Sequence, residues 1–180
     1  MRIVAGKHRG LSLEEFDADN IRPTTDRVRE NIFNKIQFDI PDSSVLDLFC
    51  GTGAVSLEFL SRNASKVISV DNNKNSIKLI EKNFTKAKEK PNLIKADYKD
   101  ALKQLSNEKF DFVFLDPPYH TNYGEDALNI ISNMSILNDS AIIIYEHLAE
   151  TEFSCPANLE IYDYKKYGTI AVSFIRIKND

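Results

Sequence analysis

The chain lacks any long hydrophobic run. Its longest purely apolar stretches are four or five residues, such as residues 141–145, whereas a membrane-spanning helix needs about 20. The first five residues are followed at once by Gly6, Lys7 and His8, which leaves too little room for the apolar region of a signal peptide. The sequence therefore predicts a cytoplasmic protein that has no membrane as a partner.

Cysteine and net positive charge are also scarce. Cys50 and Cys155 are the only cysteines, and two isolated cysteines favour neither a disulfide framework nor a zinc site, so no metal is expected. The net charge of −4 argues against a protein that coats nucleic acid non-specifically. A local basic surface remains compatible with the sequence, because residues 1–13 hold three cations and no acid.

The 180 residues, 42% hydrophobic and 28% charged, have the composition of one globular domain. No repeat, low-complexity tract or linker divides them. We expect residues 1–40 to form an N-terminal extension with a β-hairpin and a helix, and residues 41–180 to form the core. Two segments joined around Gly168, residues 159–167 and 169–177, predict a closing antiparallel pair of strands.

The chain is organised around Asp116-Pro117-Pro118-Tyr119, which follows the apolar run of residues 110–115. Such a run closed by two prolines predicts a buried strand that stops abruptly. Prolines have no N–H, so the loop presents carbonyl oxygens beside a carboxylate and an aromatic ring. Asp116 and the Pro117 carbonyl could accept the N–H bonds of an exocyclic amino group, while Tyr119 stacks on its ring. A strand-ending turn with a capping aspartate is the alternative.

A glycine turn precedes this loop. Residues 44–49 predict a buried strand that leads into Gly51 and Gly53 and then a helix, the first unit of a doubly wound sheet. Glycines let the backbone approach a ligand closely at a helix N-terminus. The next strand, residues 66–70, ends in Asp71, which lies 18 residues after Gly53. Such folds place a carboxylate on ribose hydroxyls at about this spacing.

Acidic residues follow four of the predicted strands: Asp71, Asp97, Asp116 and Glu146. In open α/β sheets ligands bind beyond the carboxyl ends of the strands. We therefore expect the first three acids to line one crevice, and Glu146 merely to cap a helix.

The helix expected in the N-terminal extension carries a charge on its apolar face. That face is formed by Val28, Ile32, Phe33 and Ile36. At 100° per residue Arg29 falls inside the same arc. Because an unpaired buried charge is costly, Arg29 is expected either to pair with a structural carboxylate or to face the site. Its candidate partners are Asp47, Asp116 and the substrate.

Several motifs resemble those of S-adenosylmethionine-dependent amino-group methyltransferases. Residues 47–53 (DLFCGTG) are similar to their cofactor loop, and residues 116–119 (DPPY), about 60 residues later, to their catalytic loop. The N-terminal signature is more specific: residues 2–6 (RIVAG), 9–10 (RG) and 22–30 (RPTTDRVRE) resemble the RsmD family. Enzymes of that family methylate N2 of one guanine in bacterial 16S ribosomal RNA. The resemblance covers essentially the whole chain.

This resemblance implies an α/β, Rossmann-like class I methyltransferase fold, with a mostly parallel seven-stranded sheet and an antiparallel last strand. It places Asp47, Gly51 and Gly53 in the cofactor loop. It further places Asp71 on the ribose hydroxyls and Asp97 on the adenine amino group of S-adenosylmethionine. By the same resemblance Asp116, Pro117 and Tyr119 bind the target guanine, and direct methyl transfer to N2 gives S-adenosylhomocysteine.

The partner implied is 16S rRNA or a small ribosomal subunit particle, approached by a monomer. The cations of the N-terminal extension are candidates to meet RNA phosphates: Arg2, Lys7, Arg9, Arg22 and Arg27. The chain departs from the family pattern at three points. Asp71 stands where a longer Glu is common, Asn63 replaces a usual Gly, and Leu11-Ser12 replaces a more basic pair.

Three other functions compete with this interpretation. An adenine-N6 methyltransferase shares the chemistry and the acceptor loop, and the N-terminal signature speaks against it. A nicotinamide-dependent dehydrogenase would use the glycine turn, but Ser56 occupies the third glycine position of its motif. A non-catalytic ribosome-assembly factor would not need an intact Asp116 and Tyr119.

Overall fold

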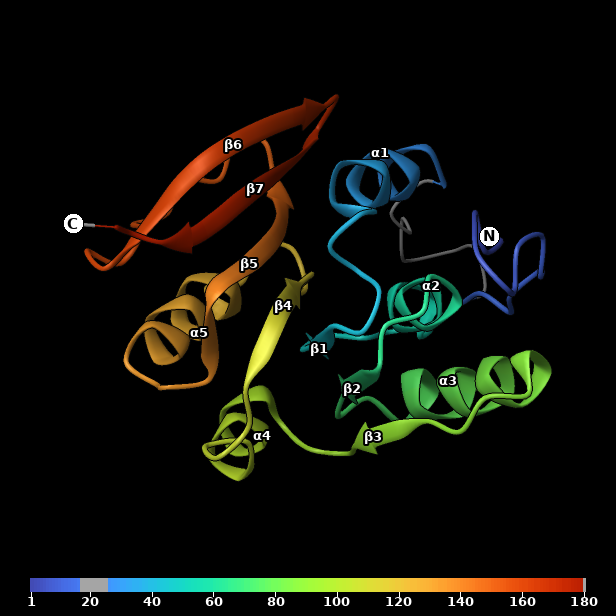
Figure 1. The fold of residues 1–180 in the computed structure, drawn as a ribbon. Coiled ribbons are helices and arrows are strands. Elements are labelled where there is room, and N and C mark those ends of the chain that lie inside the picture. Colours follow the sequence, from blue (N-terminus) through green and yellow to red (C-terminus); the bar gives the residue numbers. More distant parts are fainter. Residues whose placement is uncertain (17–25, 180) are drawn as a thin grey trace.

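The computed structural model describes residues 1–16 and 26–179, in which seven strands form one sheet with the order β3-β2-β1-β4-β5-β7-β6 (Figure 1). The strands are β1 (Ser44–Asp47), β2 (Lys66–Val70), β3 (Asn92–Ile94), β4 (Phe110–Leu115), β5 (Leu137–Leu148), β6 (Leu159–Tyr167) and β7 (Ile170–Ile177). Strands β1 to β5 pair in parallel, whereas β7 lies antiparallel to both of its neighbours. The predicted sheet, with its antiparallel last strand, is confirmed.

Helices cover both faces of the sheet. They are α1 (Asp26–Ile36), α2 (Ala54–Ser61), α3 (Lys74–Ala87), α4 (Tyr98–Gln104) and α5 (Tyr123–Ser132). Figure 1 shows α4 and α5 on one side, and α1, α2 and α3 on the other. Separate apolar clusters fill the two sides, one around Leu102 and Leu128 and the other around Phe33 and Phe59. Within the described residues, no helix is long and apolar enough to cross a membrane.

Strand β4 lies at the centre of the sheet and is buried because helices cover both of its faces. Its aromatic side chains, Phe110, Phe112 and Phe114, are no more than 1% exposed. The strand ends at Leu115, so Asp116 is the first residue beyond it. Pro117 follows and has no N–H to donate to a neighbouring strand, which is why the ladder stops here.

Strand β5 is longer than predicted. It spans Leu137–Leu148, so Glu146, which was expected to follow the strand, lies within it. The expectation that Glu146 caps a helix is therefore wrong.

The N-terminal residues fold back on themselves as predicted, although one β-bridge, between Arg2 and Ser12, replaces two regular strands. The backbone N–H of Ile3 donates to the Leu11 carbonyl at 3.0 Å, and that of Gly10 donates to the Ile3 carbonyl at 2.8 Å. This hairpin lies beside α2 and α3 (Figure 1). Its Ile3 packs with apolar residues of both helices.

Asn63, which stands where the family usually has glycine, has a left-handed backbone with φ of 69°. It lies between α2 and β2. Asparagine is one of the few residues other than glycine that tolerate this conformation, so the replacement preserves the turn.

Candidate active site

A cleft of about 710 Å³ opens at the carboxyl ends of the central parallel strands. It brings together most of the residues that the sequence predicts for cofactor binding and catalysis: Asp47, Gly51, Asp71, Asp97, Asp116, Pro117 and Tyr119. Arg29 also lines it. The three strand-end acids thus meet at one edge of the sheet, where the strand order reverses direction around β1.

The two glycines of the cofactor loop differ in what they face. Both have a positive φ, 53° at Gly51 and 78° at Gly53. At Gly51 an added Cβ would meet nothing closer than Phe16, at 4.0 Å, so this glycine leaves room in the cleft. At Gly53 an added Cβ would lie 2.6 Å from Ile80 of α3. Gly53 is not among the residues that line the cleft; it allows α3 to pack closely.

Asp71 and Asp97 are held by backbone N–H groups. Asp71 accepts hydrogen bonds from Gly51 at 2.9 Å and from Asn73 at 2.8 Å, which ties the end of β2 to the glycine loop. Asp97 caps α4 by accepting from the backbone of Lys99 at 2.9 Å. Both carboxylates are half-buried in the cleft wall. Each can therefore still receive a hydroxyl or amino donor from a ligand.

Asp47, the last residue of β1, is a buried carboxylate in the wall of the cleft. Its side chain accepts a hydrogen bond of 2.6 Å from the Ser56 hydroxyl, which lies 2.8 Å from that of Ser69. Burial raises the pKa of Asp47 to about 7, although the Ser56 hydrogen bond opposes the shift; the charge of Asp71 adds to it. A cationic group in the cleft would favour the charged form of this carboxylate.

The proline loop ends beside a second buried carboxylate. Asp116 and Tyr119 are half-buried and Pro117 is buried. The Tyr119 hydroxyl donates to Glu146 at 3.1 Å, and Glu146 is fully buried in β5. This bond fixes one end of the tyrosine ring. Sequence reasoning missed it, because Glu146 was expected at a strand end, where it would cap a helix.

Three aromatic rings of the cleft wall also escaped prediction. Phe49, Tyr98 and Tyr123 form a row in which successive ring centroids are 5.4 and 5.3 Å apart. The Tyr98 hydroxyl donates to Asp126 of α5 at 2.5 Å, and burial raises the pKa of Tyr98. Tyr123 is 41% exposed and lines the cleft, so its ring can stack on a planar ligand. Its position shortly after Tyr119 is the one sequence signal that could have pointed to it.

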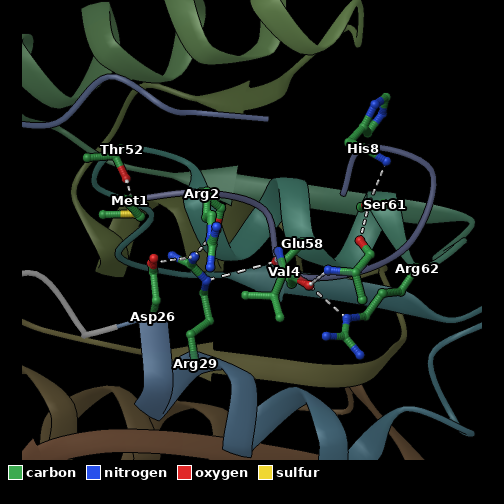
Figure 2. Close-up of polar contacts among 11 residues, drawn as sticks. Met1, Arg2, Val4, His8, Asp26, Arg29, Thr52, Glu58, Ser61 and Arg62 are labelled. Carbon is green, nitrogen blue, oxygen red and sulfur yellow. Dashed lines mark hydrogen bonds and ion pairs between the residues drawn. The ribbon is translucent and has the colours of Figure 1, made fainter. Parts of the chain in front are cut away.

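Arg29 lies on the apolar face of α1, as the helical phase predicts, and is 1% exposed. Figure 2 shows its guanidinium between Asp26 and Glu58. One Nη donates to Asp26 at 3.0 Å and to the Arg2 carbonyl, and Nε lies 3.9 Å from Glu58. Burial lowers the pKa of Arg29, whereas the charges of Glu58 and Asp26 raise it.

The carboxylates that Arg29 meets are therefore structural, and neither was among the partners named from the sequence. Asp26 is the first residue of α1 itself, and Glu58 belongs to α2. Glu58 also accepts from the backbone N–H groups of Val4 and Ala5, at 2.8 and 3.1 Å, and from Arg62 at 2.8 Å. This buried side chain holds the start of the chain against the helix that follows the glycine loop (Figure 2).

The docked N-terminal segment contributes to the cleft. Met1 and Phe16 both line it, and the Thr52 hydroxyl lies 3.9 Å from the Met1 sulfur (Figure 2). Neither residue was predicted, because nothing in the sequence shows that a segment 50 residues away covers the glycine loop.

The described cations among those predicted to meet RNA do not line the cleft. Arg2, Lys7, Arg9 and Arg27 are exposed; Arg22 falls outside the described residues. Lys7 pairs with Glu89 at 2.7 Å, and His8 shares the same carboxylate at 2.7 Å. Partial burial raises the pKa of Glu89, but the hydrogen bonds from Lys7 and His8 outweigh it and lower the pKa overall.

Comparison with known proteins gives matches along nearly the whole chain. A family model described as "Conserved hypothetical protein 95" matches residues 1–176. "Ribosomal RNA small subunit methyltransferase D" of Haemophilus influenzae is 35% identical over 95% of this chain and 91% of that protein. The Escherichia coli K12 protein of the same name is 32% identical over 95% of this chain and 87% of its own length. The solved Escherichia coli protein yhhF has a TM-score of 0.88 at 31% identity, covering 99% of this chain and 98% of that chain.

Proposed function

The chain belongs to the conserved hypothetical protein 95 family, the RsmD family of the sequence resemblance, and from this membership we propose that it transfers a methyl group from S-adenosylmethionine to N2 of a guanine in 16S ribosomal RNA. The observation that carries the proposal is the single cleft in which the glycine loop and the Asp116-Pro117-Pro118-Tyr119 loop face each other. One loop suits a nucleoside cofactor and the other suits an amino group on a planar base.

The cleft fits the cofactor by its donors and acceptors. Asp71 presents a carboxylate for ribose hydroxyls, Asp97 one for an adenine amino group, and Gly51 leaves space beside the helix N-terminus. Asp47 offers a buried negative charge to a cationic ligand. When bound, S-adenosylmethionine supplies a methyl group activated by a positively charged sulfur.

The Asp116-Pro117-Pro118-Tyr119 loop, which we call the acceptor loop, makes the amino nitrogen of the target base a better nucleophile. The lone pair of an exocyclic amino group is delocalised into its ring, which makes the nitrogen a poor nucleophile. Asp116 and the Pro117 carbonyl accept its two N–H bonds and leave the lone pair available. Tyr119, held through its hydroxyl by Glu146, stacks on the base and fixes its direction. Catalysis by this site is therefore mostly positioning and hydrogen-bond acceptance.

The substrate class follows from the family and from the need to expose the base. A guanine within a folded RNA must be splayed out to reach a cleft of this kind. We propose 16S rRNA or the small subunit particle as the partner, and a cytoplasmic monomer as the working form. Light scattering of the purified protein measures its molar mass and so tests whether it is a monomer.

The test is incubation of labelled S-adenosylmethionine with 16S rRNA, with 30S particles and with DNA, followed by nucleoside analysis. We expect label in N2-methylguanosine from RNA, and none with Asp116→Ala, which keeps its cofactor affinity. Label in N6-methyladenosine would select the adenine methyltransferase instead. Undiminished turnover by Asp116→Ala would contradict the role of the acceptor loop.

A further inference from the structure

Helix α3 carries a regular row of lysines. Lys74, Lys78, Lys82 and Lys86 recur every four residues, and Lys88 and Lys90 continue the series. Residues 74–90 contain these six lysines and only two acids, Glu81 and Glu89. This local charge of +4 contrasts with the net charge of −4 of the whole chain.

The row faces solvent. The buried side of α3 is formed by Ser76, Ile80, Asn83, Phe84 and Ala87. At 100° per residue the four helical lysines are centred on the opposite side of the helix, and all six lysines are exposed. We call them the lysine face of α3.

The lysine face does not stabilise the helix that carries it. Like charges four residues apart destabilise a helix by about 0.2–0.5 kcal/mol per pair. The two acids of the segment point elsewhere, Glu81 to Lys95 and Glu89 to the hairpin. Of the six lysines, Lys86 is the one with an ion pair to a described carboxylate, Glu14, at 3.6 Å. The others keep uncompensated charges with respect to the described residues.

The position of the lysine face links two features of the site. The N-terminal end of α3 reaches the rim of the cleft, which Asn73 and Ser76 line. Its C-terminal end lies beside the hairpin (Figure 1), where Glu89 binds Lys7 and His8. The row from Lys74 to Lys86 is about 18 Å long at 1.5 Å per residue, and it extends from the cleft toward Lys7 and Arg9.

We propose that the lysine face of α3 binds the phosphodiester backbone of the RNA segment that lies between the hairpin and the cleft. The inference rests on the proposed function, since it assigns a path to that same substrate. Evenly spaced, exposed ammonium groups suit phosphate contacts that position a substrate without reading its sequence. The residues exposed between the lysines are polar, such as Asn75 and Thr85, and offer no apolar wedge for a membrane surface.

The experiment compares two triple variants of equal charge. Lys74→Gln, Lys78→Gln and Lys82→Gln remove half of the lysine face. Lys103→Gln, Lys109→Gln and Lys178→Gln remove three exposed lysines near the amino ends of the parallel strands, opposite the cleft. RNA affinity is measured against salt concentration, together with cofactor affinity, kcat and the KM for RNA.

We expect the α3 variant to bind RNA about ten-fold or more weakly at low salt, with a log–log salt slope smaller by about two to three, since each phosphate contact contributes about 0.7–0.9. Its KM for RNA rises, while kcat at saturating RNA and cofactor affinity stay unchanged. The control variant keeps the wild-type slope. A wild-type slope in the α3 variant, or an equal loss in both variants, overturns the proposal.

Two further outcomes separate this proposal from the function on which it rests. If wild-type protein forms methylguanosine but the α3 variant has an unaltered slope, only the lysine face is misassigned. If wild-type protein methylates no RNA, both proposals fail. Loss of binding to anionic phospholipid vesicles with unchanged RNA binding assigns the face to a membrane, and likewise overturns the RNA path.

Discussion

Two buried carboxylates on either side of the glycine loop have opposite surroundings. Glu58 on α2 is 0% exposed; it accepts from two backbone N–H groups and from Arg62, and the Arg29 Nε lies 3.9 Å away as an ion-pair partner. Asp47 at the end of β1 is 1% exposed, and the donors described for it, the hydroxyl and the backbone N–H of Ser56, are neutral.

The difference indicates what each carboxylate is for. A buried charge is stable where the fold supplies cations and N–H groups, and Glu58 uses them to dock the N-terminal segment. Asp47 has only neutral donors and no cation among the contacts described, and it lines the cleft, so a cationic ligand can complete its surroundings. Incomplete compensation of a buried charge is characteristic of binding sites.

The largest effect is expected from Glu58→Ala. Removing one partner of a buried ion pair leaves the other charge uncompensated and costs about 3–5 kcal/mol of stability; here Arg62 loses its 2.8 Å acceptor, and Arg29 loses a carboxylate at 3.9 Å but keeps Asp26 and the Arg2 carbonyl. Urea unfolding measures the loss. Glu81→Ala is the control, because its pair with Lys95 is about half exposed and contributes at most about 1 kcal/mol. Equal losses in the two variants would show that Glu58 is not the anchor of the N-terminal segment.

Asp47→Asn tests the other side of the comparison. The amide keeps the volume and an acceptor for Ser56 but removes the negative charge. A lost charge-assisted interaction of about 1.5–3 kcal/mol weakens cofactor binding by about ten- to hundred-fold, which calorimetry measures. Asp111→Asn is a matched control, since Asp111 accepts from the Ser44 backbone at the start of β1 and from Asn138 of β5 and does not line the cleft. Unchanged affinity in Asp47→Asn contradicts the proposed role.

The raised pKa of Asp47 gives this comparison a pH dependence. Between its ordinary value of 3.8 and about 7, the native state holds a proton that the unfolded chain has released. The proton on Asp47 therefore stabilises the native state. This stabilisation is fully present below about pH 4 and is lost as the pH rises through about 7.

Two trends follow from that sign. The stability of Asp47→Asn relative to wild type rises from pH 5 to pH 8. Cofactor affinity of the wild type also rises as pH approaches about 7, by at most ten-fold per pH unit, and levels off above it, because a cation favours the charged carboxylate. The affinity of the variant stays flat over the same range. Parallel pH profiles in calorimetry would exclude Asp47 as the titrating group.

Arg29→Lys examines the residue that joins the two regions, since Arg29 faces Glu58 and lines the cleft. Lysine keeps the charge but loses the planar fork that reaches Asp26 and the Arg2 carbonyl together. We expect turnover to fall about ten-fold, equivalent to about 1.4 kcal/mol, with a smaller loss of thermal stability. Wild-type turnover combined with a large fall in melting temperature would make Arg29 purely structural.

Local patterns predicted much of this site. The run ending at Asp116, the strand ending at Asp71 and the 100° phase of Arg29 each depend on neighbours in sequence. The role of Glu58 could not be predicted, because its partners Val4 and Ala5 lie more than 50 residues away. A charged residue in a helix is usually assigned to the surface until tertiary packing shows what covers it.

The family resemblance supplied roles that the residues alone left open, such as N2 of guanine as the target. It did not indicate the lysine face of α3 or the contact between Tyr119 and Glu146. The lysine row is visible in the sequence, but its position between the hairpin and the cleft requires the packing of α3, and the contact of Tyr119 requires the true end of β5 at Leu148. Both are properties of the folded chain.

The smallest effect is expected at Tyr119, where Glu146 is a third buried carboxylate with a neutral donor. Tyr119→Phe keeps the ring and removes the 3.1 Å hydrogen bond to Glu146. A hydrogen bond to a charged group contributes about 1.5–3 kcal/mol, and because this one orients the ring without touching the reacting atoms, kcat falls by only about ten-fold or less. Tyr119→Ala loses the stacking surface too and is more severe, while cofactor affinity is kept in both. A Tyr119→Phe variant as slow as Tyr119→Ala would show that the hydroxyl, and not the ring, carries the role of this residue.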